Sequence, residues 1–165
     1  MTALADLSTV VLGPLTGRPL ESWQQAPAGK WTPAQIVEHL ALAVEMSATT
    51  FTARRTKEPM TRRGTTLLEK LGRVFTFGLG RFPPGLKAPD RTTPPPRVDG
   101  PAAEAHFRNA LAAWAAMERE LLPARRRDLF VKHPRLGDLT IEEWARFHVV
   151  HARHHARQIR ARLRA

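Results

Sequence analysis

The chain has 165 residues, a hydrophobic content of 42% and a formal net charge of +11. It contains no cysteine, which excludes disulfides, thiolate metal sites and a cysteine nucleophile, so any thiol chemistry would need a thiol from outside the chain. The length is sufficient for one sizeable hydrophobic core, and no internal repeat is visible, so we interpret residues 1–165 as a single domain.

The positive charge raises the hypothesis of a nucleic-acid or other acidic partner. The excess is mostly arginine spread over several segments, which favours a generally basic surface, and we do not expect nucleic acid to be the main partner. No apolar run approaches the ~20 residues of a membrane span, and the first residues lack the basic start and long apolar run of a signal peptide. A cytoplasmic protein without membrane contact is therefore expected.

Apolar residues recur mostly at helical spacing and strand-type alternation is scarce, which predicts an all-α protein. Residues 3–12 are expected to form a short helix that ends at Gly13. Residues 13–31 should be mostly loop, with Leu20 and Trp23 in a short turn packed on the core.

A second helix is predicted from Thr32 to about Lys57. Thr32 with Gln35 forms a capping box, and Pro33 occupies the first turn, where its missing N–H costs nothing. His39 is the only histidine of this helix and lies on its buried side. The face predicted to be buried consists of Ile36, Leu40, Ala43 and Ser47.

A third helix is predicted over residues 61–79 and a fourth over residues 101–122. Residues 80–101 hold half of the 14 prolines, so we interpret them as a long crossover loop, a candidate lid over a cleft. His106, beside the apolar stripe of the fourth helix, is interpreted as a structural or surface residue. The apolar face of the third helix consists of Leu67, Leu68, Leu71, Phe75 and Leu79.

After a connection over residues 123–139, the stretch 140–164 is predicted to form one long helix, because Thr140 and Glu143 make a capping box and no Pro or Gly follows. Its inner face combines apolar side chains with histidines: Ile141, Trp144, His148, His151, His155 and Ile159. Its outer face is basic, with Arg146, Arg153, Arg157, Arg160 and Arg164. His151 and His155 lie one turn apart, about 6 Å, which is the spacing by which one helix offers two nitrogens to one metal ion.

These helices and connections suggest a four-helix bundle, in which His39 could converge on His151 and His155. The segments GKWTPAQIVEHL (29–40) and HPRLGDLTIEEWARFHVVHARHHARQI (133–159) resemble the DinB/YfiT-like superfamily, in the branch known as uncharacterised bacterial proteins. The resemblance implies an up-down-down-up four-helix bundle that holds a divalent metal, zinc or nickel, with His39, His151 and His155. It also implies that a homodimer is common. Some relatives are transferases or isomerases that use bacillithiol, mycothiol or glutathione.

Three imidazoles around a metal ion would leave one position open for water or substrate, as catalytic sites do. The alternative is a trio of histidines hydrogen-bonded in a core cleft without metal. His148 could be a partner behind the ligands, a proton shuttle or a substitute ligand, but a partly exposed position at the cleft mouth is favoured. His154 is interpreted as structural or solvated, and Gln158 as a residue that could bond across helices.

Two functional hypotheses follow. The first is a metal-dependent enzyme, a thiol transferase or a hydrolase, with catalytic residues unknown beyond the metal site. The second is a non-enzymatic, stress-linked bundle that acts as an interaction or nucleic-acid-binding module. It is motivated by the superfamily's name, which refers to DNA-damage-inducible expression, and by the basic helix face. No nucleophile-elbow motif and no phosphate-binding glycine loop are present.

Overall fold

The structure of the chain is a computed structural model that describes residues 4–80, 82 and 87–164. Residue 3 of the predicted first helix, and residues 81 and 83–86 of the predicted loop, lie outside the described residues. Within them there are five α-helices and one pair of short strands, which confirms a predominantly helical protein. No helix in this part of the chain combines the length and the apolar character needed to cross a bilayer.

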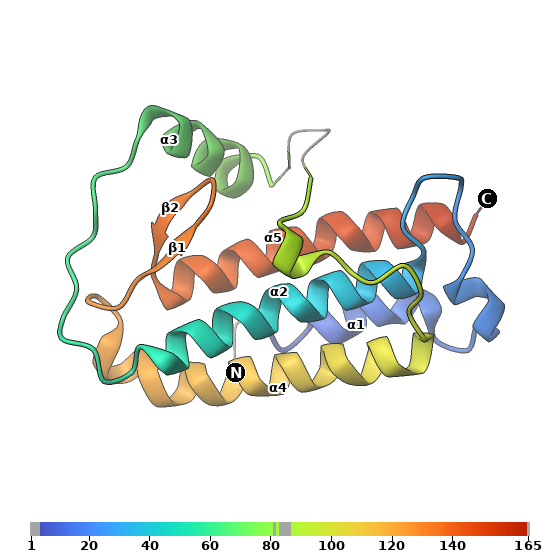
Figure 1. The fold of residues 1–165 in the computed structure, drawn as a ribbon, viewed down its shortest axis with the longest axis horizontal. Helices are drawn as coiled ribbons and strands as arrows, with labels where there is room; N and C mark the ends of the chain where they lie inside the picture. The colour runs from blue at the N-terminus through green and yellow to red at the C-terminus, as the bar shows by residue number, and fades with distance from the viewer. Residues whose placement is uncertain (1–3, 81, 83–86, 165) are drawn as a thin grey trace.

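Three long helices surround the core (Figure 1): α2 (Pro33–Ala53), α4 (Gly100–Arg125) and α5 (Ile141–Arg162). Helix α2 packs along α4, and α5 packs against α2 and against the short helix α1 (Leu7–Leu12). The interior between these helices is filled with large, fully buried side chains. They include Ile36, Leu40, Phe51, Phe107, Trp114, Ile141 and Ile159.

The predicted starts of α2 and α5 are confirmed. In α2, Thr32 Oγ1 accepts from the Gln35 N–H and the Gln35 side chain accepts from the Thr32 N–H. In α5, Thr140 and Glu143 form the same reciprocal pair. Such boxes satisfy N–H groups that would otherwise lack partners at a helix start, so the sequence locates these ends well. Helix α2 ends at Ala53, earlier than the predicted Lys57.

The N-terminal segment differs from the prediction in two details. Helical turning does not stop at Gly13, because a 3-10 turn over Gly13–Leu15 continues α1, with a proline where a missing N–H is tolerated. The turn predicted around Leu20 and Trp23 exists as a 3-10 turn, and Trp23 is buried in the core. Leu20 is 60% exposed, so its predicted packing on the core is wrong.

The third predicted helix is shorter than residues 61–79 and lies outside the core. Helix α3 covers Leu67–Arg73 and continues as a π-helical turn over Val74–Gly78. Its apolar side chains, expected to form a packing face, are exposed. The space between α1, α2, α4 and α5 is already filled by their own side chains, so α3 packs beside the strands instead (Figure 1).

The connection predicted over residues 123–139 contains two elements that the sequence did not reveal. Helix α4 continues past Pro123 to Arg125, and strands β1 (Val131–His133) and β2 (Gly137–Leu139) form an antiparallel hairpin. Val131 pairs with Leu139, and both are buried. Three residues per strand are too few for a recognisable alternation of apolar and polar residues.

The segment before α4 crosses α2 and supplies one wall of the interior (Figure 1). Its described part contains a 3-10 turn at Asp90–Thr92, and Thr92 is buried although it lies in a proline-rich stretch. The turn contacts α2. The predicted crossover thus packs against α2, and its 3-10 turn reaches the region of His39.

Candidate metal centre

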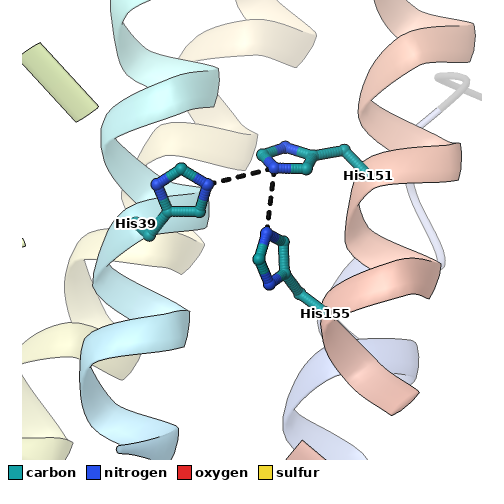
Figure 2. Close-up of side chains that lie close together, drawn as sticks. All are labelled: His39, His151 and His155. Atoms are coloured by element: carbon teal, nitrogen blue, oxygen red, sulfur yellow. Dashed lines mark hydrogen bonds between the residues drawn. The ribbon is translucent and has the colours of Figure 1, made fainter. Parts of the chain in front are cut away.

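Three imidazoles from two helices meet inside the protein. Figure 2 shows His39 on α2 facing His151 and His155 on α5. The Nε2 atom of His151 lies 3.0 Å from Nε2 of His39 and 3.1 Å from Nε2 of His155. The three residues are 4%, 9% and 8% exposed, and one nitrogen from each lies within 4.8 Å of the others. The structure therefore brings together the three histidines that the sequence singled out, in a group that could hold a metal ion.

Two of the rings are fixed by partners on their far side. His39 Nδ1 lies 2.7 Å from the Thr92 carbonyl oxygen, which can only accept, so this nitrogen carries the proton. His155 Nδ1 lies 2.8 Å from Gln158 Oε1 and donates to it in the same way. A neutral imidazole has one N–H, so Nε2 of both rings presents a lone pair towards His151.

Because the protons of His39 and His155 are on Nδ1, at most one of the three Nε2 atoms that meet can carry a proton. One N–H cannot form good hydrogen bonds with both facing lone pairs. If His151 carries its proton on Nε2, it can satisfy one of the two facing lone pairs well, and its buried Nδ1 has no partner in the described part of the chain. If the proton is on Nδ1, three lone pairs converge. Unpaired polar atoms in the interior are costly. A cation where the three Nε2 atoms meet would accept all three converging lone pairs, because tetrahedral zinc with Zn–N of 2.0–2.1 Å places its ligand nitrogens about 3.3 Å apart.

Burial keeps these rings in the form that can bind a metal ion. Desolvation lowers the pKa of His39, against the opposing effect of its bond to Thr92. Desolvation, followed by the nearby His155 and His39, lowers the pKa of His151 well below its ordinary value. Desolvation, with His39 as the next cause, lowers the pKa of His155 to about 3. All three are therefore neutral at pH 7, as metal ligation requires.

Aromatic side chains surround the trio. The Phe147 ring stacks on His151 at 5.2 Å, and the Phe82 ring approaches His151 edge-on at 5.6 Å. Trp31 is partly exposed and lies 5.0 Å from the His39 ring. Among the described residues, no carboxylate contributes to the pKa shifts of the three histidines. The site therefore combines neutral nitrogen donors with an apolar lining.

His148 does not lie at a cleft mouth, so the favoured prediction for this residue is wrong. It is 2% exposed, and its Nε2 is 2.8 Å from Ser47 Oγ on α2. The Trp114 ring packs against it edge-on. Desolvation lowers its pKa to about 3. The buried inner face of α5 therefore includes the helical turn that carries His148.

Gln158 bonds along its own helix, which corrects the prediction that it could reach across helices. Its Oε1 accepts from His155, and its Nε2 is 3.1 Å from Nε2 of His154. His154 is half-buried, in agreement with its interpretation as structural or solvated. One amide therefore links a histidine of the buried trio to a histidine nearer the surface.

His106 joins α4 to α2, in agreement with its predicted structural or surface role. Its Nδ1 is 3.0 Å from both carboxylate oxygens of Glu38, and its Nε2 is 3.2 Å from Glu45. Desolvation, the largest single influence, lowers the pKa of His106, but the hydrogen bonds and charges of the two glutamates together raise it above the ordinary value.

Two residues at the centre could not be predicted from the sequence. Thr92 lies 53 positions from His39 in a proline-rich segment, and its contribution is a backbone carbonyl, which no side-chain pattern can reveal. Phe82 comes from the same crossover. Both contacts depend on the path of the chain between distant elements.

The comparisons with known proteins identify one family. The family described as "Protein of unknown function (DUF1569)" matches residues 17–162, a range that includes the three histidines of the centre. The comparisons with curated proteins and with solved structures found no match. None of these comparisons bears on the DinB/YfiT-like resemblance, which stays a prediction.

Proposed function

The chain belongs to the DUF1569 family, and we propose that it is a divalent-metal-binding protein with His39, His151 and His155 as ligands. The observation that carries the proposal is the convergence of three neutral imidazoles whose Nε2 atoms meet with more lone pairs than N–H groups. Imidazole nitrogen suits zinc and nickel, the two metals that the DinB/YfiT-like resemblance implies.

The arrangement of the helices supports a DinB-like four-helix bundle of α1, α2, α4 and α5. In Figure 1, α1 and α5 run in one direction while α2 and α4 run in the other. Two consecutive core helices with the same direction need a long crossover, and the segment between α2 and α4 provides it. This is the order of directions that an up-down-down-up bundle requires.

We propose that the centre serves a metal-dependent transferase or hydrolase. Three protein ligands leave a coordination position open, and a bound divalent ion would lower the pKa of a water or thiol there. Three neutral histidines also leave the ion's charge uncompensated, which favours an anionic fourth ligand such as hydroxide or thiolate. The chain has no cysteine, so a thiol substrate or cofactor would be an external molecule of low molecular weight.

The chain's own residues would prepare and shield this centre. Thr92 and Gln158 hold two rings with Nε2 directed inward. Such partners orient ligands and raise their basicity. Phe82 and Phe147 limit the access of water around His151, which strengthens electrostatic interactions within the site.

Metal content tests the proposal directly. Protein purified without a histidine tag should contain, or take up on titration with Zn²⁺ or Ni²⁺, one equivalent of metal per chain. The variant His151→Ala should lose this binding. His106→Gln is the matched control, because it removes an imidazole that lies outside the trio, and it should bind as the wild type does. Failure of the wild-type protein to bind either metal would refute the proposal.

The outer face of α5 supports a second candidate function, binding of a nucleic acid or another polyanion. The predicted arginines of this face are exposed: Arg146, Arg153, Arg157 and Arg160 on the helix, and Arg164 just after its end. Contacts of this kind to phosphates give an affinity that falls steeply with salt concentration. A gel-shift series on duplex and single-stranded DNA tests it, and absence of binding at low salt removes this candidate.

A further inference from the structure

The most unusual surface of the described chain is the outer side of α3 and the π-helical turn that follows. Six large apolar side chains lie exposed within thirteen consecutive positions, and we call them the α3 face. Their exposed fractions are 74% for Leu67, 80% for Leu68, 50% for Leu71, 59% for Val74, 44% for Phe75 and 60% for Leu79. Elsewhere in the described residues, only Leu20 is a large apolar side chain with comparable exposure.

The size of the α3 face is that of an interface. With roughly 150–200 Å² for a fully exposed large apolar side chain, these fractions amount to about 550–730 Å². The largest apolar patch on a typical monomer is about 300–600 Å². A standard interface buries about 800 Å² on each partner, so the α3 face with a polar rim would be sufficient for one.

The opposite side of α3 contacts the hairpin and α5 through several side chains. Arg73 forms an ion pair with Glu143 and donates to the Leu136 carbonyl oxygen. A side chain at Gly72 would lie 2.8 Å from the Arg135 carbonyl oxygen, and the Glu69 carboxylate lies directly against Gly137. These contacts hold α3 against the hairpin with its apolar side outward. The apolar side chains are therefore exposed although the helix is packed on the protein.

We propose that a second copy of this chain covers the α3 face. Leu68, Leu71 and Phe75 recur at intervals of three and four residues, so they form one stripe along the helix. Two antiparallel stripes related by a two-fold axis near Leu71 would cover each other, because a two-fold interface uses the same patch on both copies. Interfaces between identical chains are also more apolar than other interfaces, as this face is.

The charges around the face favour a protein partner over a lipid surface. A helix that lies on a membrane carries free Lys or Arg along its polar side. In α3 the polar side is used for the hairpin and α5, and Lys70 is its one cationic group without an ion pair among the described residues. The dimer surface would thus carry little charge of its own despite the net charge of +11.

Sedimentation equilibrium tests the proposal. Standard interfaces give dissociation constants from micromolar downward, so the wild-type chain at ~100 µM should have the mass of a dimer. Leu68→Glu places a charge in the stripe at a position that is already exposed, and it should halve the mass without changing the helical circular dichroism. The matched control is Leu20→Glu, which changes an exposed leucine outside the α3 face and should leave the dimer intact.

Covalent trapping provides a second measurement. Because the chain has no cysteine, Leu71→Cys introduces a single thiol near the proposed axis, and mild oxidation should produce a disulfide-linked dimer. Leu20→Cys should stay monomeric on a denaturing gel under the same oxidation. Equal cross-linking of both variants would count against the proposed axis.

Two results would overturn the inference. One is a wild-type chain that is monomeric at ~100 µM, above the micromolar range expected for such an interface. The other is a dimer that Leu68→Glu leaves intact. If the monomeric wild type, but not Leu68→Glu, co-sediments with vesicles of phosphatidylcholine and phosphatidylglycerol, the occupant is a lipid surface and the second copy is excluded.

Discussion

Helices α3 and α5 begin with the same local signal and end in opposite environments. Each starts with a reciprocal capping box, Thr66 with Glu69 in α3 and Thr140 with Glu143 in α5. Each carries a stripe at helical spacing. In α5 the stripe includes polar imidazoles and is buried, whereas in α3 it consists of leucine, valine and phenylalanine and is exposed.

This contrast shows that hydropathy alone does not decide burial. The helical period determines which residues share a face. Whether that face is covered depends on what the rest of the chain places against it. For α5 the covering elements are α1 and α2, and the polar rings in the interior acquire partners such as Ser47 and Thr92.

The largest expected difference between the two stripes is in stability. Ile159→Ala removes a fully buried side chain of α5 and should lower the free energy of unfolding by about 2–5 kcal/mol. Leu68→Ala in α3 should change it by about 0.5 kcal/mol or less. Urea unfolding followed by circular dichroism at low protein concentration, where a dimer would be dissociated, compares them. A large loss for Leu68→Ala would mean that α3 is buried in the monomer.

The imidazoles of α5 should affect metal binding and stability in opposite directions. His151→Leu should weaken Zn²⁺ binding by about 100-fold or more, since even partners behind a ligand contribute 10–100-fold. In the metal-free protein the same change should leave the stability equal or raise it, because it removes a buried polar atom without a partner. Calorimetric titration with Zn²⁺ and urea unfolding in the presence of a chelator measure the two effects. A marked loss of stability without metal would indicate that the trio is a structural hydrogen-bonded cluster.

A smaller effect is expected from the amide behind the centre. Gln158→Leu removes the acceptor that orients His155 and should weaken Zn²⁺ affinity by about 10–100-fold. Arg157→Gln, one residue earlier on the exposed side of α5, is the control and should bind normally. Equal affinities of the two variants would show that Gln158 does not position the ligand.

The last expected effect, the pH dependence contributed by His148, is absent at neutral pH and develops only on acidification. Its pKa is about 3 in the folded chain, because of burial, and about 6.5 when unfolded. Above pH 6.5 both states are neutral and the ring contributes nothing. As the pH falls below 6.5 the unfolded state takes up the proton first, so stability decreases, by up to about 1.4 kcal/mol per pH unit until pH 3.

His148→Gln should therefore give the metal-free protein a shallower loss of stability between pH 6.5 and pH 4 than the wild type. Urea unfolding at several pH values in the presence of a chelator provides both curves. If stability falls equally with pH in the variant and the wild type, His148 takes up its proton in the folded protein as readily as in the unfolded chain. The remaining slope would come from the other buried histidines, which His148→Gln leaves in place.

The sequence predicted the parts of the fold that depend on neighbouring residues. Two helix starts were predicted because a capping box is complete within four residues; the pairs are Thr32 with Gln35 and Thr140 with Glu143. The spacing of His151 and His155 predicted that their nitrogens would lie together, since four residues make about one turn. Likewise, the alternation of arginine and apolar positions identified the outer and inner faces of α5, which the exposures confirm.

The tertiary structure alone decided what distant segments bring to one another. It placed the Thr92 carbonyl behind His39, buried His148 against Ser47 and left the α3 face outside. Local patterns carry no information on these contacts, because each depends on how fully the other helices occupy the interior and on the path of the crossover. The local sequence determines where a helix starts and which residues share a face, whereas burial depends on the packing of the whole chain.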